Sequence, residues 1–484
     1  MILKNQENTV VYSDGETTEK RMLEIAKKYP EDLSQDYIAN CSEYTVNNTF
    51  SSVRRNILNW YSFKKNATIL EIGAGMGAVT GLLCDKAKRV VSIEMSEARA
   101  EVIRARYGKR DNLKIISVDI TQWDSEEKFD YVIFIGVLEY AGVFSDAENP
   151  YEKFLSNAKK HLKEDGILLF AIENKLGLKY WVGASEDHLQ KPFAGLKGYT
   201  EKKTPKTFSK YELNQMLKNT GFEYRKFYYV LPDYKFPEII ATDERQPDYL
   251  TLKKVSFTYS KNSLLTLDEK RLYKDVLENQ VLDFFANSFL VEAGKDEPAG
   301  RHAIYVSGRG EAKKEYRVST IIYDDGSILK VPMHESAVAH IQKIYDYTQY
   351  LTERGIHILP YEKRGETLFC KIYKGKSAQK YFAELLKKNE RGQLFEFLEN
   401  FRKELLKTSK QIFDKSILNE MDISMDDYQI GPVLEKGFID MTFYNCFYDN
   451  NEFIFYDQEW CFENIPLDFI LFYSIKSTYT RLQV

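Results

Sequence analysis

Three acidic residues, Glu71, Glu94 and Asp119, stand at or near the ends of three successive apolar segments. If these segments are parallel strands of one sheet, their carboxyl ends share an edge and the three acids converge on one crevice. Carboxylates at that place repel a diphosphate, attract an ammonium group and accept hydrogen bonds from hydroxyl and amino groups. The pattern therefore predicts a site for a positively charged nucleoside that carries no phosphate.

A glycine-rich turn follows the first of these segments, in LEIGAGMGAVTG (70–81). Gly73, Gly75 and Gly77 allow a tight turn and a close approach of the backbone to a ligand at the start of a helix. The turn alone leaves two kinds of ligand open, because it also satisfies the dinucleotide pattern G-x-G-x-x-A, counted to Ala78.

The acids favour S-adenosylmethionine over a dinucleotide. Glu71 suits the ammonium group of this ligand, Glu94 suits its ribose hydroxyls, and Asp119 suits its adenine amino group. Neighbouring residues complete the predicted cofactor site: Ala74, Met95, Ile120 and Gly136.

The elements that must position these residues are strands and helices in alternation. We expect strands at 67–73, 89–95, 112–119, 129–136 and 166–173, with two later strands at 222–234 and 284–294. We expect helices at 78–88, 96–108 and 149–166. This alternation predicts an α/β fold, a Rossmann-like seven-stranded and mostly parallel sheet that is covered on both faces.

Residues 67–173 resemble the class I S-adenosylmethionine-dependent methyltransferases. The resemblance rests on the E-x-G-x-G-x-G turn, on the acids after the second and third strands, and on FDYVIFIGVLEYA (129–141), which matches the fourth motif of that family. It implies that the turn holds the methionine part of the cofactor. It also implies that Gly136, Val137, Leu138 and Glu139 line the position of the transferring methyl, which makes Glu139 a candidate acceptor contact.

Candidate acceptor contacts follow the fifth expected strand, in a predicted loop over the mouth of the site. Asn174 and Tyr180 are the candidates in this loop. His188 is a candidate general base for a hydroxyl acceptor, whereas a phosphate oxygen is already anionic and needs no base. A structural role for His188 is the alternative. Arg54, in the polar and aromatic segment 34–58, is a candidate contact for an anionic acceptor, and this segment is a candidate lid.

The C-terminal half carries a second constellation, with Asp440 and Asn445 five residues apart and Asp457 after a predicted β-hairpin. Kinases space a catalytic Asp and a metal-binding Asn in this way and add a second metal-binding Asp. The region resembles the small bacterial kinase-like phosphotransferases, which implies ATP and Mg²⁺, with Asp440 catalytic, Asn445 and Asp457 as metal ligands, and Lys330 on the nucleotide. It lacks the His-Arg before Asp440 and the Phe-Gly after Asp457 of protein kinases, so a degenerate fold used for binding is the alternative.

The order of the two halves resembles the bifunctional methyltransferase–kinases that end the growth of polymannose O-antigen chains. We expect a methyltransferase domain with an N-terminal lid at 1–296 and an α+β kinase-like domain, shortened or part of a longer polypeptide, at 297–484. The resemblance implies a glycan acceptor or its terminal phosphate. The alternatives are a protein or small-metabolite methyltransferase whose C-terminal half only binds, and an adaptor that recruits glycosyltransferases.

Composition describes an ordinary globular protein of 484 residues with a net charge of -4. This balance and the lack of a dense Lys/Arg stripe disfavour nucleic acid as a partner. The five cysteines form no metal-binding or disulfide pattern, and we expect neither a signal peptide nor a transmembrane segment. The expected location is the cytoplasm.

Overall fold

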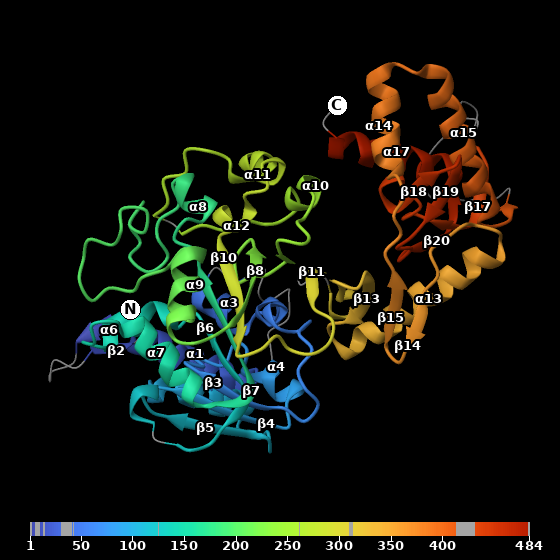
Figure 1. Cartoon of the computed structure of the whole chain (residues 1–484). Coiled ribbons are helices and arrows are strands. Elements are labelled where there is room, and N and C mark those ends of the chain that lie inside the picture. The colour runs from blue at the N-terminus through green and yellow to red at the C-terminus, as the bar shows by residue number, and fades with distance from the viewer. Residues whose placement is uncertain are drawn as a thin grey trace. The chain divides into compact units, whose positions relative to one another are not determined.

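The computed structural model describes residues 2–4, 10–12, 15–30, 41, 43–123, 125–260, 262–308, 313–412 and 431–482. The chain divides into two compact units (Figure 1). Unit 1 comprises Met1–Lys313 and Tyr323–Asp325, and unit 2 comprises Lys314–Ile322 and Gly326–Val484.

Unit 1 is built on a large sheet whose centre is parallel. In spatial order its strands are β11 (Ala303–Gly308), β9 (Ile239–Ala241), β8 (Tyr224–Leu231), β10 (Ser288–Gly294), β7 (Leu162–Glu173), β6 (Phe129–Ile135), β3 (Thr68–Ile72), β4 (Arg89–Glu94) and β5 (Leu113–Ser117). The five strands from β7 to β5 are parallel, and β10 lies antiparallel between β7 and β8. The expected seven-stranded sheet is thus present, and β9 and β11 extend its edge beyond β8 by antiparallel pairing.

Helices and short segments connect these strands or precede them. Their bounds are β1 (Ile2–Lys4), β2 (Val10–Tyr12), α1 (Glu16–Lys28), α3 (Tyr44–Phe50), η1 (Ser52–Ile57), α4 (Thr80–Lys86), α5 (Glu97–Tyr107), η2 (Ile120–Gln122), η3 (Leu138–Tyr140), α6 (Ala141–Phe144), α7 (Pro150–Lys160), α8 (Leu178–Trp181), α9 (Lys210–Asn219), α10 (Tyr249–Leu252), α11 (Glu269–Glu278) and α12 (Leu282–Phe285). Residues 34–40 and 42 of the expected lid lie outside the described residues.

The core of unit 1 follows from the alternation of side chains along each strand. Leu70 and Ile72 of β3 share one apolar cluster with Phe154 and Leu155 of α7. Glu71, between them, points to the other face, where its partner Thr80 lies on α4. Helices α7 and α4 therefore cover opposite faces of the sheet, as a doubly wound fold requires.

The helix expected at 149–166 is shorter than predicted. Helix α7 ends at Lys160, and β7 begins at Leu162. The polar residues Lys163, Glu164 and Asp165 misled the prediction, because they belong to the exposed start of a strand whose later residues are buried. The pairing of β6 with β7 also shifts register between Phe129 and Tyr131, which shows where this irregular start joins the regular ladder.

Unit 2 contains a small antiparallel sheet in the order β14 (Glu362–Arg364), β15 (Thr367–Lys371), β13 (Ser327–Pro332) and β12 (Val318–Tyr323). Strands β12 and β13 form an antiparallel hairpin. The other elements of this unit are η4 (Lys314–Tyr316), η5 (Glu335–Ala337), α13 (Val338–Glu353), α14 (Ala378–Lys388), α15 (Arg391–Lys407), β16 (Gln411–Ile412), β17 (Val433–Phe438), η6 (Phe443–Asn445), β18 (Cys446–Asp449), β19 (Glu452–Phe455), β20 (Cys461–Pro466) and α17 (Leu467–Leu482). Among the described residues, no helix has both the length and the apolar character that a bilayer crossing requires.

Candidate functional site: a cavity at the strand ends and a buried polar cluster

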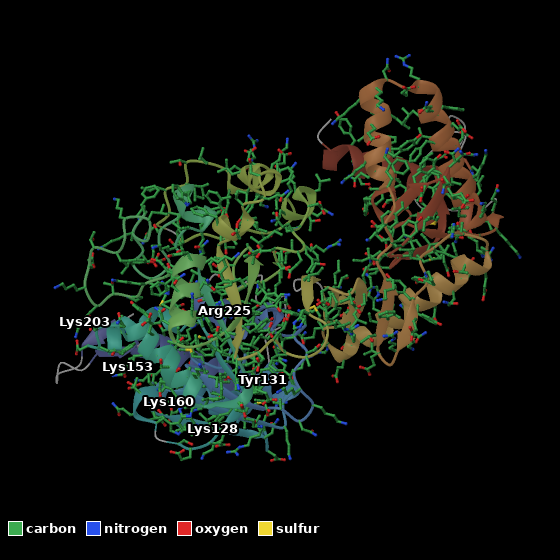
Figure 2. All side chains as sticks on the ribbon, in the orientation of Figure 1. Lys128, Tyr131, Lys153, Lys160, Lys203 and Arg225 are labelled. Carbon is green, nitrogen blue, oxygen red and sulfur yellow. The ribbon has the colours of Figure 1, made fainter. Side chains whose placement is uncertain are left out.

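A cavity of ≈ 490 Å³ lies at the carboxyl ends of the parallel strands of unit 1. The predicted cofactor residues that line it are Gly73, Glu94, Met95, Asp119, Ile120 and Gly136. The cavity also has cationic and apolar lining that sequence reasoning missed, chiefly Arg99, Tyr140, Lys153 and Lys160. Lys153 and Lys160 project from α7 (Figure 2). Their spacing of seven residues, two helical turns, was a signal that could have revealed a shared face.

The glycine turn has the backbone that only glycine adopts easily. Gly73, Gly75 and Gly77 have φ angles of 65°, 59° and 80°. At Gly73 a Cβ atom would also lie 2.6 Å from Cγ2 of Val137, a cavity-lining residue. Gly75 and Gly77, like Ala74, do not line the cavity themselves; they shape the turn that leads from β3 to α4.

Glu94 connects the turn to the second strand. Its carboxylate accepts a hydrogen bond from the N–H of Gly75 at 2.8 Å and another from the N–H of Ser96 at 2.9 Å. Asp119 is half-buried at the end of the third strand and accepts hydrogen bonds from the N–H and hydroxyl of Thr121. Both acids are thereby held in place at the cavity wall.

Glu71 does not line the cavity. The structure therefore does not place it for the direct contact with the cofactor that we expected from the sequence. The side chain points to the α4 face, where its carboxyl accepts hydrogen bonds from the hydroxyls of Thr80 at 2.8 Å and Ser92 at 2.5 Å. Burial raises the pKa of Glu71 to about 7, against the effect of these hydrogen bonds. Glu71 therefore braces the joint between β3, β4 and α4.

A buried polar cluster lies behind the loop that follows β7. Its acids come from four places in the chain: Glu139 on η3, Glu173 at the end of β7, and the pair Asp187 and Asp233 from later loops. Two lysines balance them, Lys179, which is buried, and Lys235, which is half-buried. Lys179 pairs with Asp187 and Asp233 at 2.8 and 2.7 Å, and Lys235 pairs with Glu173 and Asp187.

His188 sits within this cluster rather than at the cavity wall. Its Nδ1 lies 3.0 Å from an oxygen of Glu186, and its Nε2 lies 3.9 Å from Oε1 of Glu139. Burial opposes a charge on the ring, but the hydrogen bond with Glu186 and the charges of Glu173 and Glu139 outweigh it and raise the pKa of His188 to about 9. A ring that already carries its proton at neutral pH does not accept another, so this arrangement does not favour the general base considered from the sequence. The His188 ring instead packs edge-to-face on Tyr140.

The other candidate acceptor contacts are also engaged inside the protein. Arg54 is buried and donates to the backbone oxygen of Tyr234 at 3.4 Å. Asn174 donates to the backbone oxygens of Phe284 and Ala286, both at 2.8 Å, which ties the end of β7 to the segment before β10. The hydroxyl of Tyr180 donates to Asp187 at 2.5 Å. None of the three lines the cavity.

The kinase-like constellation of unit 2 comes together around Lys330. Its ammonium group pairs with Asp457 and, at 2.8 Å, with Glu459. These carboxylates outweigh the effect of burial and raise the pKa of Lys330 above its usual range. Glu459 was not a candidate in the sequence, because no motif marks it.

Asp440 and Asn445 lie next to this pair. The carboxylate of Asp440 accepts hydrogen bonds from the N–H groups of Glu459 and Trp460 at 2.9 and 3.0 Å, and Asn445 donates to the backbone oxygen of Asp440 at 3.2 Å. Burial raises the pKa of Asp440 to about 6.

Comparison with known proteins agrees with the first unit of the fold. Residues 70–168 match the family described as a methyltransferase domain. The ribosomal RNA small subunit methyltransferase A of Borrelia garinii subsp. bavariensis is 30% identical over 114 residues, which are 23% of this chain and 37% of that protein. The protein of the same name from Koribacter versatilis is 40% identical over 55 residues, 11% of this chain and 19% of that protein. The chain thus spans well under half the length of these relatives.

Two solved structures are also similar. The phosphoethanolamine N-methyltransferase 2 of Haemonchus contortus, in complex with S-adenosyl-L-methionine, has a TM-score of 0.33 and 16% identity, covering 57% of this chain and 60% of that one. A SAM-dependent methyltransferase from Archaeoglobus fulgidus has a TM-score of 0.32 and 16% identity, covering 50% of this chain and 92% of that one.

The sheet order gives unit 1 a Rossmann-like α/β fold, with a cavity at the carboxyl ends of its parallel strands. The matched residues 70–168 contain the glycine turn, Glu94 and Asp119, so the match to a methyltransferase domain falls on the predicted cofactor residues.

Proposed function

We propose that the protein methylates a bacterial surface-polysaccharide precursor, or the phosphate at its end, and that unit 2 is a phosphotransferase domain. The observation that carries the methyl-transfer part is the cavity whose wall holds Glu94 and Asp119 beside the glycine turn. The donor set fits S-adenosylmethionine: Glu94 for the ribose hydroxyls, Asp119 for the adenine amino group, and the backbone of the turn for the methionine part. When bound, this cofactor supplies an electrophilic methyl group.

Three cationic side chains support an anionic acceptor. Arg99, Lys153 and Lys160 line the cavity, so part of its wall attracts negative charge. A phosphate oxygen is a nucleophile without prior loss of a proton, which agrees with a cavity wall that holds no histidine among the described residues. The role of this chain in such a transfer is to hold cofactor and acceptor in line and to exclude water.

The contacts of Lys330 support a phosphotransferase. A buried lysine on the sheet pairs with an aspartate that follows a hairpin, and Asp440 and Asn445 lie beside them with the spacing that kinases use. Carboxylate and amide oxygens from Asp457 and Asn445 suit Mg²⁺, and the ammonium group of Lys330 suits the phosphates of ATP. A binding module without catalysis is the alternative for this unit.

Two transfer assays test the proposal. Purified chain is incubated with methyl-labelled S-adenosylmethionine and, in parallel, with a phosphorylated glycan primer, the same primer without phosphate, and small-subunit ribosomal RNA. Methylation of the phosphorylated primer alone is the expected result. Methylation of the RNA would overturn the glycan as the acceptor and favour ribosomal RNA, the acceptor that the names of the matched relatives state for those proteins.

The second assay follows label from the γ-phosphate of ATP to the unphosphorylated primer. Wild-type chain is expected to transfer label, and Asp440→Ala and Asp457→Ala are expected not to. Absence of transfer by the wild type, with intact methylation, would leave unit 2 as a binding module.

A further inference from the structure

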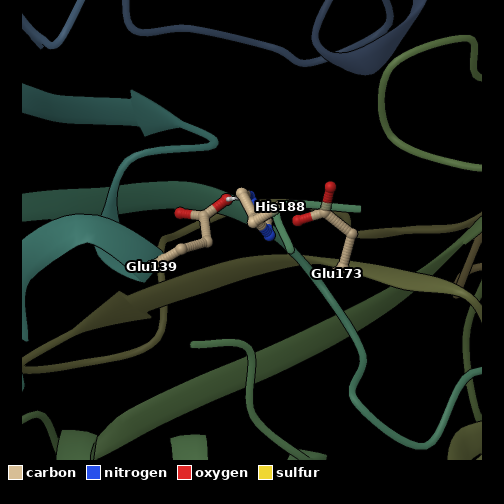
Figure 3. Close-up of side chains that lie close together, drawn as sticks. All are labelled: Glu139, Glu173 and His188. Carbon is tan, nitrogen blue, oxygen red and sulfur yellow. Dashed lines mark ion pairs between the residues drawn. The ribbon is translucent and has the colours of Figure 1, made fainter. Parts of the chain in front are cut away.

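Glu139, Glu173 and His188 bring three potential ligand atoms together inside unit 1. One atom from each side chain lies within 4.8 Å of the other two. The three residues come from different segments: η3 after β6, the end of β7, and the loop beyond α8. The side chains point toward one another in Figure 3. Both carboxylates are completely buried.

Three of the four carboxylate oxygens of Glu139 and Glu173 lack hydrogen bonds to the described residues. Neither oxygen of Glu139 has a hydrogen-bond partner among the described residues, and Oε2 of Glu173 also has none. A buried carboxylate without partners is costly, because it has lost its hydration and gained nothing in return. Proteins tolerate such groups where a bound cation or a catalytic role compensates the loss.

Outer partners hold the remaining atoms of the set in place. Oε1 of Glu186 lies 3.0 Å from Nδ1 of His188 and accepts its hydrogen bond. This contact orients the ring so that Nε2 is directed toward Glu139. Lys235 pairs with Oε1 of Glu173, and Oε2 of Glu173 has no hydrogen-bond partner among the described residues. A carboxylate behind a histidine and a hydrogen-bonded carboxylate are the usual second layer around a bound metal ion.

The spacing also fits a cation. Ligand atoms that each lie about 2.1 Å from one metal ion are about 3–4 Å apart. Nε2 of His188 and Oε1 of Glu139 are 3.9 Å apart. An ion can therefore lie between them once it has displaced the proton from Nε2 of His188.

We propose that Glu139, Glu173 and His188 form a site for a first-row divalent cation, Mn²⁺ or Zn²⁺. One imidazole and two carboxylates suit these ions better than Mg²⁺ or Ca²⁺, which prefer oxygen ligands alone. The ion joins the loop that carries His188 to the ends of β6 and β7. Tyr140 packs on His188 and also lines the cavity, so the ion stabilises one wall of the cofactor site.

Metal binding by the full chain tests this proposal without any methyl transfer. Chelator-treated protein, free of nucleotide, is titrated with Mn²⁺ while the electron paramagnetic resonance signal of free Mn²⁺ is recorded, and with Zn²⁺ by calorimetry. We expect one ion bound per chain and a rise in Tm on binding. Glu139→Gln and Glu173→Gln keep the size of each side chain and are expected to weaken binding by at least about tenfold.

Two control variants locate the ion. Glu292→Gln changes another buried carboxylate of unit 1, one that accepts hydrogen bonds from Tyr61 and Tyr228, and is expected to bind as the wild type does. Asp457→Asn changes the candidate metal ligand of unit 2 and shows whether a bound ion belongs to that unit instead. Circular dichroism checks that each variant folds, and Glu139→Asp, which retracts the carboxylate by one methylene, replaces Glu139→Gln if the latter does not fold.

The results that would overturn the proposal are specific. If the folded wild type binds neither ion, the trio is an internal ion pair in which a protonated His188 neutralises the carboxylates. If Asp457→Asn abolishes binding and Glu139→Gln does not, the ion belongs to unit 2. S-adenosylmethionine binding is measured separately by calorimetry, so that a failure of the cofactor assignment is distinguished from a failure of the metal site.

Discussion

Replacement of Glu94 by alanine is the sharpest test of the cofactor cavity. The carboxylate holds the glycine turn through the N–H of Gly75 and the next helix through the N–H of Ser96, at 2.8 and 2.9 Å. The variant loses these contacts and the proposed acceptors for the ribose hydroxyls at the same time. Each hydrogen bond to a charged group contributes about 1.5–3 kcal/mol.

The loss of one such contact in the complex weakens binding of S-adenosylmethionine about 10- to 150-fold, since about 1.4 kcal/mol corresponds to a tenfold change in Kd. Isothermal titration calorimetry measures this change directly. Glu94→Gln keeps one acceptor oxygen and is expected to fall between the alanine variant and the wild type.

Glu97→Gln is the matched control. Glu97 lies three residues further along the chain and makes an exposed ion pair with Arg104 at 2.7 Å. Exposed pairs contribute about 0–1 kcal/mol, and this one is outside the cavity lining, so affinity for the cofactor should not change. A folded Glu94→Ala protein that binds S-adenosylmethionine as tightly as the wild type, or a wild type that prefers NAD, would refute the assignment of the cavity.

Three further predictions follow from the same geometry. Gly73→Ala places a methyl group against Val137 in a backbone of positive φ, and we expect a lower Tm and loss of cofactor binding by calorimetry; unchanged binding would contradict the close approach. Burial raises the pKa of Glu71 to about 7 in the folded state, above its usual value near 4.5, so the folded state holds a proton that the unfolded state releases. Stability from this group is therefore present below pH 4.5 and is lost as pH rises to about 7, by about 3 kcal/mol. Glu71→Gln should raise Tm more at pH 8 than at pH 5 in differential scanning fluorimetry, and equal shifts would exclude this explanation. Lys330→Met leaves Asp457 without its cation, and we expect loss of ATP binding in a fluorescent-nucleotide titration together with an intact affinity for S-adenosylmethionine; retained ATP binding would remove the kinase-like assignment.

The periodicity of the sequence predicted the parallel sheet and its crevice, because buried strands and covering helices leave separate patterns. The same periodicity also predicts which face of the sheet the Glu71 side chain points to. This residue stands between Leu70 and Ile72, which share the α7 face, so strict alternation sends it to the opposite face. The expectation of a cofactor contact came from the motif, and the motif does not state the face.

The buried polar cluster could not be predicted from the sequence, for a different reason. Lys179 meets Asp233 across 54 positions of the chain, and such a pairing follows from the fold and not from local spacing. Asn174 illustrates the same limit. Its side chain donates hydrogen bonds to the backbone oxygens of Phe284 and Ala286, and no sequence motif predicts these contacts. The end of α7 was misjudged because polar residues are common both in helices and at exposed strand starts.

The position of β10 has a consequence for biosynthesis. This strand lies inside the sheet, between β7 and β8, although it consists of residues 288–294, more than a hundred positions after β7 ends. Once β8 has been synthesised, the edges of β7 and β8 that pair with β10 have no partner until Ser288–Gly294 follows. A chain that ends before Ser288 therefore lacks the strand that joins β7 to β8.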